Sequence, residues 1–283
     1  MARTIMILSD VVQKGNIMNI KKFLLAAVML APLAAHSLPD EVITYEVPRD
    51  NAWVLTREVG VMGLMMSRYA GSDTYQSMWM PEIDIRYGPF HASILHGLGM
   101  FLPLDADQTL IVQPAIRWRT ARHLTDSDRD AVQFVKDMRP TATLNIIYRP
   151  INWMMFNVRA SEGFSQSIRG TSIDFGIMYR DWIMNDRLEL TVFSNLIYGN
   201  QKYMQTYFGI TPAQSIAYGF ASHDARSGWR SWNIGFLAKY LITNSLSIDV
   251  LARYERLIDA AVQSPTVRTR DQFTIGFGTT YRF

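Results

Sequence analysis

The sequence has 283 residues, of which 48% are hydrophobic and 19% are charged, and its formal net charge is +3. Cysteine is absent, which excludes thiolate metal sites, redox motifs and cysteine nucleophiles. No uninterrupted apolar stretch after residue 40 reaches the ~18 residues of a membrane-spanning helix, which excludes such a helix from the rest of the chain.

The first predicted element is a cleavable export signal over residues 1–37. Lys21 and Lys22 form its positively charged beginning. Residues 23–35 supply an apolar core that is too short to span a membrane. Small residues follow this core, and we expect cleavage after Ser37.

The remaining chain, residues 38–283, is predicted to form one domain. We take Met18 as the true start of translation, because the residues upstream of it lengthen the charged part of the signal. Removal of residues 1–37 takes away four basic residues and one acidic residue, so that 24 of each sign remain. The positive charge therefore belongs to the signal, and nucleic acid is not expected as a partner.

Eleven strand-like segments follow in the mature chain. In most of them apolar side chains alternate with small or polar ones, as expected for a strand with one apolar face, and the pattern is less regular in the N-terminal part. In the last segment, for example, Phe273 and Phe277 share one face, whereas Thr274 and Gly276 lie on the other. The segments span 52–66, 78–87, 89–101, 107–119, 139–149, 151–163, 169–181, 186–197, 229–242, 245–257 and 271–283.

The length of these segments predicts a barrel that crosses a bilayer. Most run to about 10–13 residues, close to the ~9–11 of a tilted transmembrane strand and longer than the usual ~5–6 of a soluble strand. We therefore predict an all-β, up-and-down antiparallel barrel in the outer membrane of a Gram-negative bacterium. Because such barrels have an even number of strands, we expect twelve, with ten as the alternative. The missing strand is expected within 67–101 or at 201–209.

Short and long connections alternate along the second half of the chain. Outer-membrane barrels have short periplasmic turns and longer outer loops, so we expect the short connections in the periplasm. Tyr and Trp residues gather near the segment ends, as the aromatic girdles of such a barrel require. The short connections are 149–152, 182–187 and 241–245, and the longer ones are 120–138, 163–170, 199–229 and 257–271.

Charged residues fall on the polar face of the strands, which predicts that they line the barrel interior. At the lipid midplane each Arg or Lys would cost about 2–4 kcal/mol. These charges form either a mutually neutralising network that fills a narrow barrel or a path that is selective for ions or small solutes. The candidate residues are Arg117, Arg119, Arg149, Arg159, Asp174, Arg180, Glu189, Lys239, Asp249, Arg253 and Glu255.

Four stretches in the last third of the chain carry a family resemblance. They are Tyr203-Met-Gln-Thr-Tyr-Phe-Gly-Ile-Thr-Pro-Ala-Gln-Ser215, Ala225-Arg-Ser-Gly-Trp229, Ser264-Pro-Thr-Val-Arg268 and the terminal Tyr281-Arg-Phe283. With the weaker landmarks Ile83-Asp-Ile-Arg-Tyr87 and Gly97-Leu-Gly99, they resemble the MipA/OmpV family of outer-membrane proteins. The stretch from Ala121 to Asp128 departs from the Gly-Arg-Asp-Glu-Ser-Asp-Ser-like loop of that family.

The resemblance implies a barrel without enzymatic activity or a cofactor. Members of the family are described as scaffolds that bring together a lytic transglycosylase and a bifunctional penicillin-binding protein for murein synthesis, and others as surface adhesins or porin-like proteins. Outer-membrane lipids, lipopolysaccharide and the barrel-assembly machinery are the other expected partners. Tyr281 and Phe283 are the expected recognition signal for that machinery.

His91 and Ser93 form the one arrangement in the sequence that suggests chemistry. Two residues apart on a strand, they share one face. The pair resembles the His-x-Ser pattern of outer-membrane lipases and lipid A deacylases, in which a base activates a nucleophile. No Asn or Asp that would orient the histidine is evident in the sequence. A barrel lipid hydrolase is therefore a minor alternative, and no catalytic, cofactor-binding or metal site is predicted.

Overall fold

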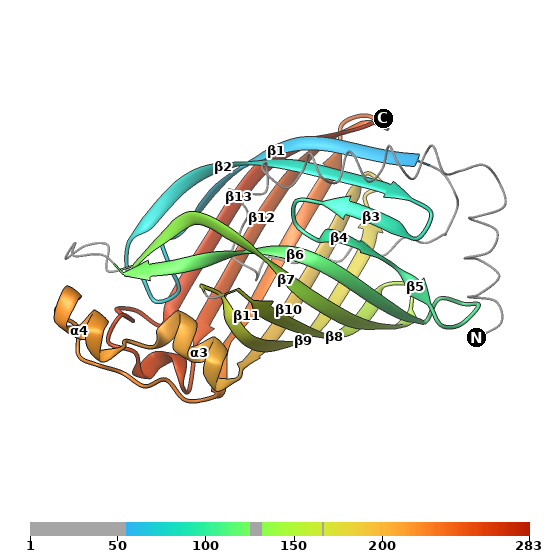
Figure 1. Cartoon of the computed structure of the whole chain (residues 1–283). Coiled ribbons are helices and arrows are strands. Elements are labelled where there is room, and N and C mark those ends of the chain that lie inside the picture. Colours follow the sequence, from blue (N-terminus) through green and yellow to red (C-terminus); the bar gives the residue numbers. More distant parts are fainter. Residues whose placement is uncertain (1–54, 125–131, 166) are drawn as a thin grey trace.

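The computed structural model describes residues 55–124, 132–165 and 167–283, and the predicted export signal (1–37) lies outside them. The described chain forms one closed antiparallel sheet (Figure 1). Its strands are β1 (Leu55–Ser67), β2 (Tyr75–Tyr87), β3 (Phe90–Ser93), β4 (Gly97–Met100), β5 (Leu102–Pro103), β6 (Leu110–Leu124), β7 (Val132–Ile151), β8 (Met154–Phe164), β9 (Arg169–Ile183), β10 (Leu188–Gly199), β11 (Gly228–Leu241), β12 (Leu246–Leu257) and β13 (Asp271–Arg282).

The closed sheet has twelve positions around its circumference. Within β1 to β4 and within β5 to β13, each strand pairs with the next strand in the chain, and β1 pairs with β13 to close the ring. Strands β4 and β5 both pair with β6, so the two share one position. The prediction of a twelve-stranded barrel is confirmed, and the alternative of ten is wrong.

The missing strand lies in the segment 89–101, which was predicted as a single strand. Strands β3 and β4 pair with each other there across a turn at residues 94–96. The other expected place, 201–209, forms helix α3 (Gln201–Phe208) instead. The side chain of Asn200 accepts a hydrogen bond from the backbone N–H of Tyr203, and this cap favours a helix over a strand at that point.

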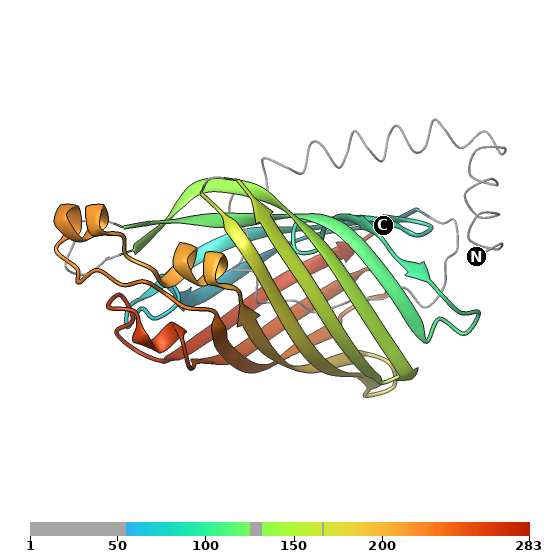
Figure 2. The same cartoon turned by 60° about the horizontal axis from the view of Figure 1, so that its bottom comes forward.

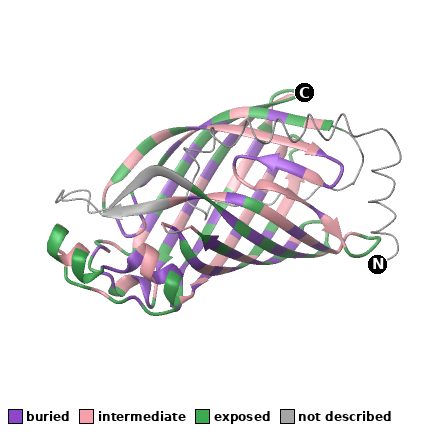
Figure 3. Ribbon diagram, in the orientation of Figure 1, coloured by how far each residue is buried: buried purple, intermediate pink, exposed green. Residues whose placement is uncertain are grey.

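The alternation in the sequence becomes an inner and an outer face of the barrel wall (Figure 3). On β13, Phe273, Ile275 and Phe277 are 50%, 52% and 61% exposed, whereas Thr274 and Thr280 are buried. The same pattern recurs on the neighbouring strands, where apolar side chains point outward. An outer face of this kind suits contact with lipid hydrocarbon.

The two ends of the barrel differ, and we call them the turn end and the loop end. The turn end has the short connections 152–153, 184–187 and 242–245, at or next to their predicted places. The loop end has the long connections 200–227 and 258–270. Figures 1 and 2 show the helices of 200–227 at the loop end and the C-terminus at the turn end.

Two predicted long links are wrong. Strands β6 and β7 continue as a paired ladder through much of 120–138, for example between Arg122 and Phe134. Strands β8 and β9 leave only 165–168 between them, where 163–170 was predicted. Backbone pairing extends beyond the alternating apolar pattern in both places, because a strand outside the hydrocarbon needs no apolar face.

Packed loops cover the loop end. Segment 200–227 contains α3 and α4 (Pro212–Tyr218), and 258–270 contains the short helix η2 (Ala261–Gln263). Helix α3 buries Tyr203, Met204 and Phe208 in a cluster with residues of 257–261. The Ser264 hydroxyl donates to the Phe208 carbonyl at 2.6 Å, which ties the two loops together. Within the described ranges, neither these nor any other helix is long and apolar enough to cross a membrane.

Glycine permits close approach at the seam between β1 and β13. Gly60 of β1 lies opposite Thr280, and a Cβ atom built on it would collide with the backbone carbonyl oxygen of Thr279. The neighbouring Val61 points outward and is 40% exposed. A side chain is therefore tolerated at 61 but not at 60.

We predict that Gly60→Ala destabilises the barrel by about 1–3 kcal/mol, the usual range for overpacking. The collision is with backbone, so it is relieved only if the seam opens. The measurement is urea unfolding of the purified barrel in lipid vesicles, followed by tryptophan fluorescence. Val61→Ala is the matched control and should change the unfolding midpoint little; equal midpoints for the two variants would contradict the role assigned to Gly60.

Candidate functional site

The barrel interior collects the charged residues that the sequence predicted for it. Nine of the eleven candidates are buried, and Arg149 and Arg180 are half-buried nearer the turn end. They divide into one group toward the turn end and one toward the loop end, with apolar side chains between. The apolar cluster contains Met62, Leu64, Met66, Met80, Phe101, Ile111, Ile147, Met155, Met178, Phe193 and Leu251.

The turn-end group is organised around Glu58, which the sequence-based prediction missed. The Glu58 carboxylate accepts from Lys239 Nζ at 3.4 Å and from Arg282 Nε at 2.6 Å, and so joins β1, β11 and β13. Arg180 forms an ion pair with Glu189 on the next strand. Glu58 has the strand parity of an inward residue, and this was the signal that could have identified it.

Asp249 extends the turn-end group to β12. Its carboxylate accepts from the Thr280 hydroxyl at 2.7 Å and from the Ser247 hydroxyl at 3.4 Å. Asp249 is 1% exposed, so these bonds supply part of what water would otherwise provide.

The loop-end group contains arginine–carboxylate pairs. Arg159 Nε donates to Asp174 at 2.6 Å, and both side chains are 6% exposed. Arg253 pairs with Glu255 at 2.9 Å, and Arg230 reaches the same carboxylate at 3.5 Å. Paired in this way, the buried charges avoid part of the large cost of isolated ions.

Arg230 was missed because a β-bulge changes the inward parity of β11. The register between β10 and β11 shifts at Ile197, so that both Arg230 and Ser231 are buried although they are adjacent in sequence. An extra residue in one strand re-aims a side chain in this manner. Strict alternation along β11 would place Arg230 on the outer face, together with Trp232 and Ile234.

Tyr203 of α3 links opposite sides of the barrel mouth. Its hydroxyl accepts from Arg230 Nη1 of β11 at 3.0 Å. The guanidinium carbon of Arg119 on β6 lies 5.3 Å from the centre of the Tyr203 ring, within the range of a cation–π contact. Arg119 also donates to the Ser172 hydroxyl of β9 at 3.2 Å. Helix α3 is thus held over the loop-end charges by side chains of β6 and β11, and Ser172 of β9 holds Arg119 in place.

Arg117, the remaining loop-end candidate, holds the turn between β3 and β4. Its Nη2 donates to the backbone carbonyl of Leu95 at 2.9 Å. Arg149 has a similar task at the other end, where its Nη2 donates to the Gln108 carbonyl at 3.2 Å. Both arginines therefore bind backbone oxygens of neighbouring connections.

His91 and Ser93 share the inward face of β3, but their contacts differ. Ser93 Oγ accepts from the backbone N–H groups of Leu95 and His96 at 3.2 and 3.4 Å, which caps the turn after β3. His91 Nε2 lies 3.0 Å from Gln113 Nε2, and its ring centre is 4.8 Å from that of Phe101. These contacts assign both residues to holding the β3–β4 hairpin in the wall.

We predict that Asp174→Asn destabilises the barrel by about 3–5 kcal/mol, because it leaves the buried Arg159 without its carboxylate. Arg159→Met combined with Asp174→Leu should recover much of this loss, since no buried charge then remains at the pair. Urea unfolding in lipid vesicles measures both.

The exposed pair Arg256–Asp271 is the matched control, with side chains 44% and 43% exposed. Asp271→Asn should cost only about 0–1 kcal/mol. Equal losses for the buried and the exposed pair would contradict the importance of burial.

The sequence is similar to known outer-membrane proteins over most of its length. A sequence profile of the MltA-interacting protein MipA family matches residues 59–283. The "Putative outer membrane protein YiaT" of Escherichia coli (strain K12) is 25% identical over 160 residues, which cover 56% of this chain and 64% of that protein. The "Outer membrane protein Omp26La" of Vibrio anguillarum is 28% identical over 108 residues, covering 38% and 41%. The matched part spans less than two thirds of the length of either relative.

Solved structures with a similar chain path are also outer-membrane barrels. The "COG4313 outer membrane channel from Pseudomonas putida F1" has a TM-score of 0.46 at 10% identity, covering 86% of this chain and 100% of that one. The NanC porin has a TM-score of 0.40 at 11% identity, covering 79% and 98%. The profile match extends over most of the chain. This outer-membrane β-barrel belongs to the MltA-interacting protein MipA family.

Proposed function

We propose that this protein is a closed barrel that anchors a periplasmic contact surface for cell-wall enzymes, a lytic transglycosylase and a bifunctional penicillin-binding protein. The observation that carries the proposal is the burial of inward side chains along the barrel. Lys239 and Glu58 near the turn end, Phe193 in the middle and Arg253 toward the loop end are all 2–7% exposed.

A filled interior favours an anchor over a channel. In an aqueous pore, inward side chains stay in contact with water, as in wide barrels of 16–18 strands. Here methionine, leucine, isoleucine and phenylalanine side chains from most of the wall contact one another. At the loop end, Tyr203, Met204 and Phe208 of α3 are at most 2% exposed and cover the charges below them.

The turn end is the face that a periplasmic enzyme meets, because outer-membrane barrels place their short connections in the periplasm. We define the turn-end surface as residues 104–109, 152–153, 184–187 and 242–245. It exposes large apolar side chains, including Leu104 at 60%, Trp153 at 42% and Met184 at 64%. We infer from these exposed apolar side chains that the turn-end surface takes part in protein contact. The family description, MltA-interacting protein, supports a partner of this kind.

We predict that a photo-crosslinking residue at Met184 captures the two cell-wall enzymes in intact cells, because Met184 lies on the turn-end surface. The measurement is identification of the captured proteins by mass spectrometry. Ile216 of α4 at the loop end is the matched control, since it is an exposed aliphatic residue (88%) on the opposite side. Failure to recover a murein hydrolase or synthase from Met184, or equal recovery from Ile216, would remove the assignment.

We also predict that the purified full-length chain gives no steady conductance in planar bilayers. Side chains that fill the interior leave ions no hydrated path. Single-channel recording at several voltages is the measurement, with a known porin inserted under the same conditions as the positive control. Long-lived, ion-selective current steps from the folded protein would contradict the anchor function and indicate a narrow channel instead.

A further inference from the structure

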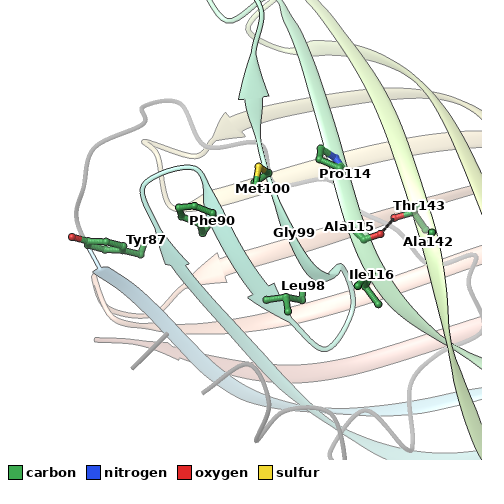
Figure 4. A pocket seen from close by; sticks show the side chains of 10 residues that line it. All are labelled: Tyr87, Phe90, Leu98, Gly99, Met100, Pro114, Ala115, Ile116, Ala142 and Thr143. Carbon is green, nitrogen blue, oxygen red and sulfur yellow. Dashed lines mark hydrogen bonds between the residues drawn. The ribbon is translucent and has the colours of Figure 1, made fainter. Parts of the chain in front are cut away.

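The outer wall contains an apolar groove beside the β3–β4 hairpin (Figure 4). Its volume is about 440 Å³, within the ~300–1,000 Å³ of pockets that bind small molecules. It runs between β3 and β4 on one side and β6 and β7 on the other. The lining residues are Tyr87, Phe90, Leu98, Gly99, Met100, Pro114, Ala115, Ile116, Ala142 and Thr143.

The groove forms where the ladder between β4 and β6 is interrupted. Pairing stops at Gly99–Ala115 and resumes at Leu102–Val112, so Pro114 falls in the gap. Proline has no backbone N–H to donate to a ladder, which explains the interruption. In the same gap Phe101 N–H donates to the Pro89 carbonyl at 2.7 Å instead of to β6.

Few large side chains point outward beside this interruption of the ladder. Phe101 is buried and packs in the interior cluster rather than outside. Gly99 adds only backbone to this face, because a Cβ atom there would point inward and lie 2.8 Å from His91 Nε2. Ala142 lies opposite Ile116 on the next strand and contributes only a methyl group. The outer face of the wall is therefore hollow at this point, whereas other positions on the outer face carry large apolar side chains.

The lining is almost entirely carbon. Leu98, Met100 and Ile116 present aliphatic side chains around the groove (Figure 4). The Thr143 hydroxyl donates to the Ala115 carbonyl at 3.1 Å, and Figure 4 marks this bond. That hydroxyl is therefore used within the wall. An occupant must consequently be apolar over the part that enters.

The groove begins near the turn end. Tyr87 is the last residue of β2 and Phe90 the first of β3, and both lie next to the short connection between these strands. From there the lining passes along the wall toward Ile116 and Ala142. An elongated apolar chain that enters from the turn end fits this course.

We propose that the groove binds one acyl chain of a phospholipid from the periplasmic leaflet of the outer membrane. The barrel wall lies in the hydrocarbon of that membrane, so acyl chains are present at high concentration. The turn end faces the periplasm, and the leaflet on that side is the one from which a chain can enter past Phe90. Lipopolysaccharide is in the opposite leaflet, next to the loop end.

The test reconstitutes the full-length chain in phospholipid vesicles that contain a phospholipid with a diazirine on its acyl chain. After illumination, mass spectrometry maps the labelled peptides. We expect label concentrated on residues 97–116 relative to the lipid-facing residues of β11 and β12. Ala142→Trp fills the groove and should reduce labelling of 97–116 by about tenfold or more, because each displaced methylene weakens binding by about fourfold.

Ala252→Trp is the matched control, because Ala252 is a half-buried alanine of β12 in the same apolar series as Val250 and Tyr254. Heat-dependent mobility on gels checks that both variants fold; if Ala142→Trp does not fold, the label distribution on the unmodified chain decides. Even labelling around the barrel, or equal labelling of the two folded variants, overturns the proposal. Label on 97–116 that appears only with a photoactivatable lipopolysaccharide overturns the assignment to phospholipid.

Discussion

The structure depends on one constraint: hydrocarbon offers no hydrogen bonds to a polypeptide backbone. Every N–H and C=O group in the membrane must therefore find a partner in the chain. Pairing of β1 with β13 meets this need, because it removes the two free edges that an open sheet would leave. Closure also fixes which side chains face lipid and which face inward. The exposed Phe277 and the buried Thr274 of β13 are consequences of the same ladder.

Closure creates a second problem, which is the content of the interior. Polar side chains directed inward lose water when the interior is filled, so they need one another. Glu58 is shared by Lys239 and Arg282, and so connects β1 to β11, which is not its neighbour in the sheet. Glu255 is shared by Arg253 of the same strand and Arg230 of the neighbouring β11. The methionines and aliphatic residues between the two groups need no partners. Unbranched methionine adapts to the irregular space that remains.

Much of the barrel could be predicted from the sequence, because many long alternating segments in one chain fit few architectures besides a transmembrane barrel. The strand number, the inward parity of Asp174 or Arg253 and the short turns are of this kind. Features that break the alternation could not be predicted. Strands β3 and β4 are too short to show a period, and the bulge at Arg230 reverses parity locally. The groove arises because Pro114 interrupts the ladder in the middle of a predicted strand. The groove is deep because the Phe101 side chain points into the barrel interior and not outward.

The two helices at the loop end differ in how freely they can change over evolutionary time. Helix α3 buries three of its residues, and Tyr203 is bonded to the barrel beneath it. Helix α4 buries none, and Ile216 projects almost fully into solvent. Substitution of Ile216 on α4 therefore disturbs the fold less than substitution of Tyr203, Met204 or Phe208 on α3, which would loosen the cover of the barrel. Under selection by antibodies or phages that bind the cell surface, we expect the amino-acid sequence of α4 to vary more than that of α3.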